Sequence, residues 1–319
     1  MGKHDYQVGS LTLNIAWVFP GQGSQFVGMG KDIFNNSKIA KNYFQKANKI
    51  LGYDIKSIIL NGPDKTLKKT IYTQPSIYIL SVIIGKILLT KGNRPSVVAG
   101  HSLGEYSALT ISGAFSFSSG LKLVKIRAEQ MELASRSQSG TMAAIIGLNN
   151  DKIIELCSSS KRNETVVPAN FNSPQQVVIS GSEKGVKSLI KKAKELGAKM
   201  TILLNVGGAF HSPLMKTARV FLEEALDSTE FSDTICPVYT NADAKPHSSS
   251  SKIKSLLLKQ LESPVLWSQT ISGIINNMRI KKFYEVGPGK VLLGLNKRID
   301  KTLKTVNVGT LEDINNINV

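Results

Sequence analysis

Residues 97–105 set the expected fold of this chain: Val97-Val98-Ala99-Gly100-His101-Ser102-Leu103-Gly104-Glu105. They begin as a short apolar run, pass through a Gly-x-Ser-x-Gly turn and continue as a helical pattern. The two glycines remove the Cβ atoms that would clash in so tight a strand-to-helix turn. The turn lifts the Ser102 hydroxyl above the edge of a sheet, so the segment predicts a nucleophile elbow. A chance pentapeptide in a glycine-rich chain would lack the flanking strand and helix.

On both sides of this segment, apolar β-prone runs alternate with helical patterns, which is typical of a mainly parallel sheet covered by helices. Strands are expected at residues 15–19, 97–99, 238–240 and 283–286. Helices are expected from residue 77 onward and at 105–110 and 121–134. The longest apolar run, residues 77–90, contains Lys86 and is shorter than the roughly 20 residues that a membrane-spanning helix needs. It therefore predicts a buried core helix.

Residues 138–206 follow a different rhythm. The pattern predicts strands at 141–147, 165–167, 176–180 and 201–204, with helices at 151–158 and 183–196. This βαββαβ order is that of a ferredoxin-like unit. Gly140 and the pair Gly207-Gly208 lie near its two ends and are candidate hinges. The expected architecture is α/β: a large domain formed by residues 1–137 and 207–319, interrupted at 138–206 by a small α+β subdomain.

The composition is that of an ordinary globular protein. Of the 319 residues, 41% are hydrophobic and 20% charged, which excludes disordered, collagen-like and coiled-coil classes. Cys157 and Cys236 are far apart in the sequence and belong to no CxxC motif, so neither a disulfide framework nor a zinc knuckle is expected. A reducing compartment fits this cysteine usage.

The net charge of +17 favours anionic partners. Nucleic acid is not expected among them, because the basic residues form short runs without an arginine-rich tract or interleaved aromatics. A general preference for Lys at exposed positions explains most of the excess. Residues 1–14 show no apolar signal region, and Tyr6 stands where a myristoylation motif needs Ser or Thr. We therefore expect no export signal, lipid anchor or membrane association.

A serine nucleophile needs a base, and four histidines are available. His4 lies near the N-terminus, and His247 lies in a segment expected to be a solvated loop. His101 adjoins Ser102, but its side chain should point away across the turn. His211 remains, in a glycine-rich loop that enters a helix, and a serine followed by a histidine is the chain order of α/β-hydrolases. The alternative is a capping or surface histidine.

Two further kinds of group would assist Ser102 and the base: donors to an oxyanion and an acceptor that orients the histidine. The backbone N–H of Leu103, at a helix N-terminus, should point at an oxyanion formed on the attacked carbonyl. Asp243 is a candidate to orient His211, although a backbone or amide carbonyl could accept its Nδ1–H instead. No metal is expected, since His101 and Glu105 do not form an HExxH motif.

Arg127 interrupts the apolar face of a predicted helix, a stripe made by Leu121, Val124, Ala128 and Met131. A buried, unpaired guanidinium costs several kcal/mol, whereas its fork matches a carboxylate. Arg127 is therefore either part of a structural salt bridge, a side chain whose charged end reaches water, or a group that binds a carboxylated substrate.

Five motifs in combination make the chain resemble the malonyl-CoA:acyl-carrier-protein transacylases of type II fatty acid synthesis. They span about residues 15–298 and occur in family order. They are Phe19-Pro20-Gly21-Gln22-Gly23-Ser24-Gln25; Gly100-His101-Ser102-Leu103-Gly104-Glu105; Arg127; Gly208-Ala209-Phe210-His211-Ser212; and Gln260-Leu261 with Pro264-Val265-Leu266-Trp267 and Tyr284-Glu285-Val286-Gly287-Pro288-Gly289-Lys290.

The resemblance implies an α/β-hydrolase-like core with a parallel sheet and an inserted ferredoxin-like subdomain. It implies that Ser102 is malonylated, that His211 acts as base and then acid, and that Arg127 holds the malonyl carboxylate. It further implies an oxyanion hole made by two backbone N–H groups, those of Gln22 and Leu103. The remaining implied roles are a carbonyl of Gln260 that orients the histidine, Asn170 on the pantetheine side, and Phe210 in the form associated with malonyl over methylmalonyl groups.

The resemblance also implies a ping-pong reaction without a cofactor, in which malonyl-CoA and an acidic holo-acyl-carrier protein are the partners. A basic surface would speed the encounter with both. We expect a free-standing monomer in the bacterial cytoplasm or a plastid stroma. The competing interpretations are a serine hydrolase or thioesterase, which would share Ser102 and His211, and a polyketide-type acyltransferase, which is normally part of a longer chain.

Overall fold

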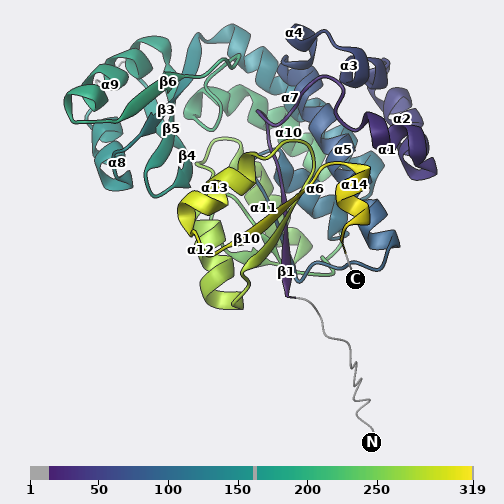
Figure 1. Cartoon of the computed structure of the whole chain (residues 1–319). Coiled ribbons are helices and arrows are strands. Elements are labelled where there is room, and N and C mark those ends of the chain that lie inside the picture. The colour runs from purple at the N-terminus through teal and green to yellow at the C-terminus, as the bar shows by residue number, and fades with distance from the viewer. Residues whose placement is uncertain (1–13, 161–163, 318–319) are drawn as a thin grey trace, which may run out of the picture.

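Six strands form the main sheet of the protein, seen in a computed structural model that describes residues 14–160 and 164–317 (Figure 1). Their order is β10-β9-β1-β2-β7-β8, and every neighbouring pair is parallel except β7 with β8. The strands are β1 (Ile15–Phe19), β2 (Val97–Gly100), β7 (Val238–Tyr239), β8 (Pro246–His247), β9 (Lys282–Val286) and β10 (Lys304–Val308).

Helices cover both faces of this sheet, and β1 shows why. All five of its residues are buried, as in a strand covered on both sides. Trp17 and Phe19 pack into one hydrophobic core, with side chains of α2 (Lys38–Leu51), α5 (Thr70–Thr90), α6 (Gly104–Ile111) and α7 (Phe117–Ser137). Ala16 and Val18 point to the opposite face, where α12 (Trp267–Met278) and α13 (Val291–Ile299) close a second core. The predicted α/β fold is confirmed.

Helix α5 corrects one expectation. It has 21 residues, because it begins at Thr70, ahead of the apolar run from which a shorter helix was predicted. Among the described residues it is the one helix long and apolar enough to cross a membrane, yet 83% of its most apolar window is buried inside the protein. Its place against α7 and α6 in the core agrees with the predicted core helix.

Shorter elements complete the large domain. Residues 31–67 form four helices that were not predicted, and β8 and β10 were also missed. These helices are α1 (Lys31–Asn36), α2, α3 (Ile55–Asn61) and α4 (Asp64–Leu67). The others are η1 (Pro213–Met215), α10 (Lys216–Asp227), α11 (Ser250–Gln260) and α14 (Leu311–Asn315).

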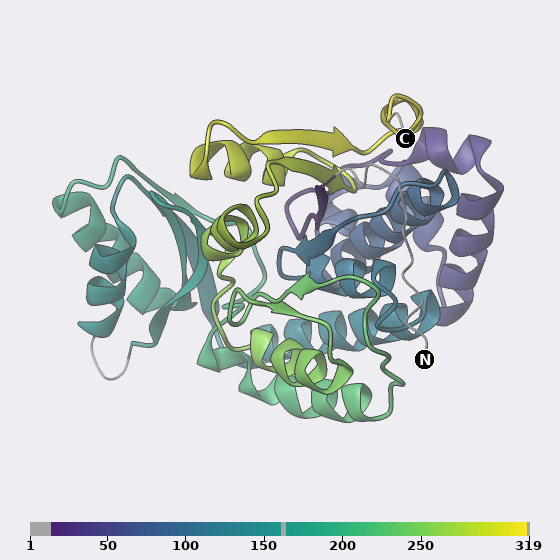
Figure 2. The same ribbon diagram turned by 90° about the horizontal axis from the view of Figure 1, so that it is seen from below.

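A second, antiparallel sheet forms the small subdomain, in the order β4-β5-β3-β6. The chain runs β3 (Gly140–Ile146), α8 (Asn150–Ser158), β4 (Val166–Ser173), β5 (Gln176–Ser182), α9 (Glu183–Glu195) and β6 (Met200–Leu203). Counted within the subdomain, its second, third, first and fourth strands are neighbours, the order of a ferredoxin-like unit. Figure 2 shows α8 and α9 on the side of this sheet that faces away from the large domain. The boundaries at 138 and 206 stay a prediction.

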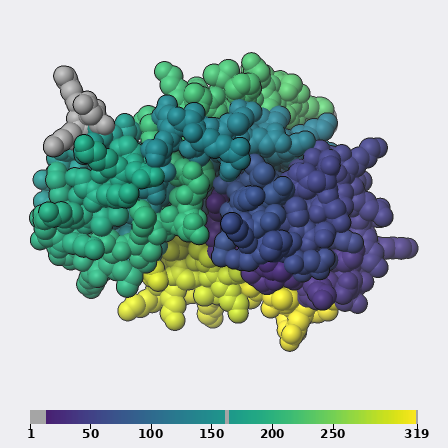
Figure 3. Space-filling view, turned by 90° about the horizontal axis from the view of Figure 1, so that it is seen from above, coloured from purple at the N-terminus to yellow at the C-terminus, as the bar shows by residue number. Residues whose placement is uncertain are grey.

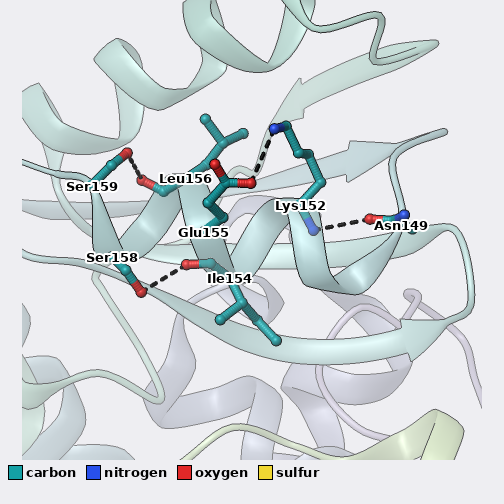
Figure 4. Close-up of polar contacts among 7 residues, drawn as sticks. All are labelled: Asn149, Lys152, Ile154, Glu155, Leu156, Ser158 and Ser159. Atoms are coloured by element: carbon teal, nitrogen blue, oxygen red, sulfur yellow. Dashed lines mark hydrogen bonds and ion pairs between the residues drawn. The ribbon is translucent and has the colours of Figure 1, made fainter.

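Local capping explains where α8 begins. Asn149 is the N-cap, and its side-chain Oδ1 accepts a hydrogen bond of 2.9 Å from the backbone N–H of Lys152 (Figure 4). The Lys152 ammonium lies 3.0 Å from a carboxylate oxygen of Glu155 on the exposed side of the helix. Ile153 and Leu156 face the subdomain's own core, so α8 is anchored on one side and solvated on the other.

One segment of the large domain joins the small subdomain through backbone pairing. The N–H of Val265 donates to the carbonyl of Ala169 at 2.8 Å, and the N–H of Phe171 donates to the carbonyl of Val265 at 2.9 Å. Val265 follows closely on Gln260, the last residue of α11. The loop after α11 is therefore held between the two domains, beside the end of β2.

Candidate active site

Ser102 lies at the turn between β2 and α6, as a nucleophile elbow requires. Its backbone is in the left-handed region, with φ of 51°, which is rare for a residue other than glycine. A Cβ atom at Gly100 would lie 1.9 Å from the carbonyl carbon of Gly104, and one at Gly104 would lie 2.0 Å from the carbonyl oxygen of Phe19. Both positions need glycine because the end of β2, the turn into α6 and the end of β1 lie too close together to leave room for a Cβ atom.

The structure brings Ser102 and His211 together. The Ser102 Oγ lies 2.7 Å from Nε2 of His211, and Nδ1 of His211 lies 2.9 Å from the backbone carbonyl oxygen of Gln260. Because that carbonyl can only accept, Nδ1 carries the proton and Nε2 is free to accept the proton of Ser102. The acceptor that orients His211 is thus a backbone carbonyl, one of the two alternatives left open by the sequence.

Asp243 is not the group that orients His211. Its carboxylate accepts hydrogen bonds from the hydroxyl of Thr240 at 2.6 Å and from Nε2 of His247 at 2.9 Å. His247 itself lies in β8 and is mostly buried, which corrects its expected place in a solvated loop. The two residues form a separate polar pair at the edge of the main sheet, so the carboxylate is occupied away from Ser102.

His211 is held as a neutral base by its surroundings. Burial and, secondly, the positive charge of Arg127 lower the pKa of His211 to about 3. The residue is 3% exposed and has a φ of 57°. It therefore remains unprotonated across the neutral range, which is the state a general base needs.

This low pKa predicts how stability depends on pH. In the unfolded chain a histidine binds a proton below about pH 6.5, whereas in the fold His211 does so only near pH 3. The unfolded state binds more protons in this window, so the free energy of unfolding should fall as pH drops from 6.5 toward 3. Urea unfolding of wild type and His211→Gln at pH 7, 6, 5 and 4 measures this free energy of unfolding. The wild type should lose more stability than the variant; parallel curves would contradict the shift.

Arg127 reaches the same serine from α7. The residue is 1% exposed, and Nη2 lies 3.0 Å from Ser102 Oγ and 3.1 Å from the side-chain Oε1 of Gln260. Nη1 donates to the side-chain oxygen of Gln74 at 2.7 Å. No carboxylate of residues 14–160 or 164–317 forms an ion pair with this guanidinium. A structural salt bridge and a solvent-exposed charge are thus both wrong, and a cation without a paired anion faces the Ser102 hydroxyl.

A pocket opens at this cluster between the two domains, and Figure 3 shows that face of the molecule. Gln22 and Leu103 line it next to Ser102. Neither of their backbone N–H groups has a hydrogen-bond acceptor among the described residues, so both are available to an oxyanion. Asn170 and Phe210, the residues expected on the pantetheine and specificity sides, also line the pocket, with the apolar side chains of Met131, Met142, Val178, Leu204 and Val206.

His101 turns away from the serine, as the turn predicted. Its Nε2 lies 2.8 Å from Oδ1 of Asn172 on β4, and its ring packs near Trp267. Burial lowers the pKa of His101. His4, the remaining histidine, lies outside the described residues. Within the described part of the chain, no group of three or more His, Cys, Asp or Glu side chains is placed to hold a metal ion.

Three residues of the site were not found from the sequence. Gln74 lies on α5 and fixes Arg127. The side chain of Asn241, after β7, accepts a hydrogen bond of 2.7 Å from the N–H of Ser102 and donates one of 2.6 Å to the carbonyl of Gly100. Glu105 is fully buried behind the elbow. A carboxylate directly after Gly-x-Ser-x-Gly, in a helix with no other charged residue, was the one available signal.

The fold and the contact between Ser102 and His211 define an α/β enzyme built on a serine nucleophile elbow. The chain belongs to the acyl transferase family, because the family model for the acyl transferase domain matches residues 16–312. The predicted resemblance to malonyl-CoA:acyl-carrier-protein transacylases is confirmed by its relatives.

Two curated relatives carry the name malonyl CoA-acyl carrier protein transacylase. The protein of Synechocystis sp. is 40% identical over 305 residues, covering 96% of this chain and all of that protein. The protein of Bacillus subtilis is 40% identical over 301 residues, covering 94% and 95%. A malonyl-transacylase solved in complex with its type II PKS acyl-carrier protein has a TM-score of 0.91 and 39% identity, covering 94% of this chain and 97% of that one.

Proposed function

We propose that this chain transfers the malonyl group from malonyl-CoA to the phosphopantetheine thiol of an acyl-carrier protein through a malonyl-Ser102 intermediate. The observation that carries the proposal is the meeting of two groups, a base and a cation, at one hydroxyl oxygen. Ser102 Oγ lies 2.7 Å from the neutral base His211 and 3.0 Å from the guanidinium of Arg127. A base activates the serine, and a buried cation beside it suits an acyl group that ends in a carboxylate.

In the first half-reaction, Ser102 Oγ attacks the thioester carbonyl while His211 Nε2 takes the hydroxyl proton. The negative charge that develops on the carbonyl oxygen is stabilised by the backbone N–H groups of Gln22 and Leu103. When the carbon–sulfur bond breaks, His211 returns the proton to the sulfur of CoA. Gln260 keeps the imidazole in the required tautomer through the backbone carbonyl at Nδ1.

In the second half-reaction, the carrier thiol gives its proton to His211 and attacks the malonyl ester. The bond between the acyl carbon and Ser102 breaks, and the serine oxygen recovers the proton. The same groups act in both half-reactions, and each returns to its starting protonation state. No cofactor is therefore consumed. Arg127 discriminates against acetyl groups, since an acyl chain without a carboxylate leaves the buried guanidinium without an anion.

The relatives and the net charge support the expected partners and location. The solved relative binds its acyl-carrier protein, and the net charge of +17 on this chain favours both acidic carriers and the phosphates of CoA. The curated relatives come from bacteria, which supports the bacterial cytoplasm over a plastid stroma. A monomeric state, and the roles of Asn170 and Phe210, remain predictions.

Intact mass spectrometry after brief mixing with malonyl-CoA tests this function directly. We expect a malonyl adduct on the wild-type protein that is discharged when holo-acyl-carrier protein is added, with the malonyl group recovered on the carrier. Steady release of free malonate without discharge onto the carrier would instead identify a hydrolase or thioesterase. Acetyl-CoA in parallel should label the protein weakly.

A further inference from the structure

Glu105 lies directly behind the catalytic groups and has no role in the steps above. It is the second residue of α6 and is completely buried. One of its oxygens, Oε2, accepts two hydrogen bonds: from the backbone N–H of Asn241 at 3.0 Å and from the side-chain Nε2 of Gln260 at 2.9 Å. The other oxygen, Oε1, has no hydrogen-bond partner among the described residues. A buried carboxyl group with one oxygen lacking a hydrogen bond destabilises the fold, and such a group needs an explanation.

The two residues that Glu105 binds hold both backbone groups of the nucleophile. The side chain of Asn241 accepts from the N–H of Ser102, while Nε2 of Gln260 donates to the carbonyl of Ser102 at 2.9 Å. The left-handed backbone of Ser102 is thus clamped from both sides. Such a conformation persists only where surrounding contacts determine it.

Gln260 also links Glu105 to the base and to the cation. Its backbone carbonyl orients His211, and its side-chain Oε1 accepts from Arg127 Nη2. A carboxamide has one oxygen and one NH₂ end, which can exchange places by rotation. The Glu105 oxygen and the Ser102 carbonyl both require the NH₂ end, so the oxygen end must face Arg127. If the Gln260 carboxamide were rotated by half a turn, its NH₂ group would face the N–H groups of the Arg127 guanidinium, and two donors would meet.

We propose that Glu105 is a positioning residue for malonyl transfer: as a double acceptor, it fixes the Gln260 carboxamide and Asn241, and thereby the direction of Arg127 and the backbone of Ser102. The inference rests on the proposed function. It predicts that Glu105 governs the preference for malonyl over acetyl groups as well as the rate, since Arg127 contributes to malonyl transfer alone.

Three substitutions separate the acceptor role from charge and from packing. Glu105→Gln keeps an oxygen for both donors, and should retain the malonyl-to-acetyl ratio of kcat/KM within about threefold. Glu105→Leu keeps the volume without an acceptor, and should lower that ratio at least about tenfold and kcat by about 30-fold, in line with the loss of one or two buried hydrogen bonds. Glu105→Asp keeps the charge but is one methylene shorter, so it should also lower the ratio.

A matched control is a contact between α5 and the other end of α6, the helix that carries Glu105. Tyr78→Phe removes two buried hydrogen bonds outside the pocket: one of 2.8 Å between the Tyr78 hydroxyl and Thr110 of α6, and one of 3.0 Å from the same hydroxyl to the carbonyl of Phe117. It should lower the melting temperature while leaving the malonyl-to-acetyl ratio unchanged. Rates are measured by intact mass on the folded protein, and wild type is run first. No malonyl adduct on wild type would overturn the proposed function.

Given wild-type labelling, the Glu105 variants decide the inference. A Glu105→Leu or Glu105→Asp protein with the wild-type ratio would show that the carboxyl oxygen does not position the site. A Glu105→Gln protein as impaired as Glu105→Leu would equally overturn the acceptor role. If Glu105→Leu does not fold, the comparison of Glu105→Gln with Glu105→Asp carries the test. If only the negative charge mattered, Glu105→Asp would keep the wild-type ratio and Glu105→Gln would lose it.

Discussion

Ser102→Ala should abolish malonyl labelling and lower transfer to the carrier protein by at least about 10⁴-fold, as removal of a nucleophile does in serine enzymes. The reason is specific to the elbow. Ser102 Oγ is the atom on which the His211 ring and the Arg127 guanidinium converge, and no other hydroxyl has contacts of this kind within the described residues. Without it, the ping-pong route has no covalent carrier.

Binding and folding should survive this substitution. Malonyl-CoA can still bind, because Arg127 keeps its contacts with Gln74 and Gln260. Ser112→Ala is a suitable control, since Ser112 is fully buried and its hydroxyl donates to the carbonyl of Leu109 outside the pocket. The control should label like wild type. An adduct on Ser102→Ala, located by peptide mass mapping, would move the nucleophile to another residue.

The elbow was predictable because its chemistry is local. Gly100, Ser102 and Gly104 stand within five residues, and the need for glycine comes from the turn itself. The same holds for β1, whose predicted bounds are those observed, and for the subdomain's order of strands and helices, where each element carries its own period. Local pattern was thus sufficient for the fold class and for the first residue of the site.

The rest of the site depends on contacts between distant segments. The hydrogen bond of His211 goes to a backbone carbonyl on α11, and no side-chain pattern marks a carbonyl as an acceptor. From the residues alone Asp243 was therefore as reasonable a partner, and only the resemblance singled out Gln260. Asn241 and Gln74 are ordinary amides in the sequence, and they acquire a role because β7 ends, and α5 begins, beside the site.

The missed elements have a similar cause. β8 is two residues long and pairs with β7 alone, and β10 is a half-exposed edge strand with a mixed pattern. Neither has the continuous apolar run that marked β1 and β2. The helices within residues 31–67 are short except for α2, so few turns were available to show a period. Packing against α5 and α7, rather than local propensity, stabilises this region.

The second large effect is expected at Arg127. Arg127→Ala should lower kcat/KM for malonyl-CoA by about 10³-fold, since truncating one partner of a buried charge pair costs about 2–5 kcal/mol and each 1.4 kcal/mol is a factor of ten. Acetyl transfer should change far less, because an acetyl group has no carboxylate to bind. The variant would therefore prefer malonyl only weakly over acetyl, which single-turnover labelling with the two CoA esters measures.

Arg127→Lys distinguishes charge from geometry. A lysine keeps the positive charge but lacks the fork that reaches Ser102, Gln74 and Gln260 together, so it should fall between Arg and Ala in malonyl preference. Arg219→Ala, which removes a half-exposed arginine on α10, is the matched control for loss of one positive charge and should keep the wild-type ratio. If Arg127→Ala kept the malonyl preference, the cation beside Ser102 would serve the fold instead of the substrate, and specificity would have to come from the apolar walls of the pocket.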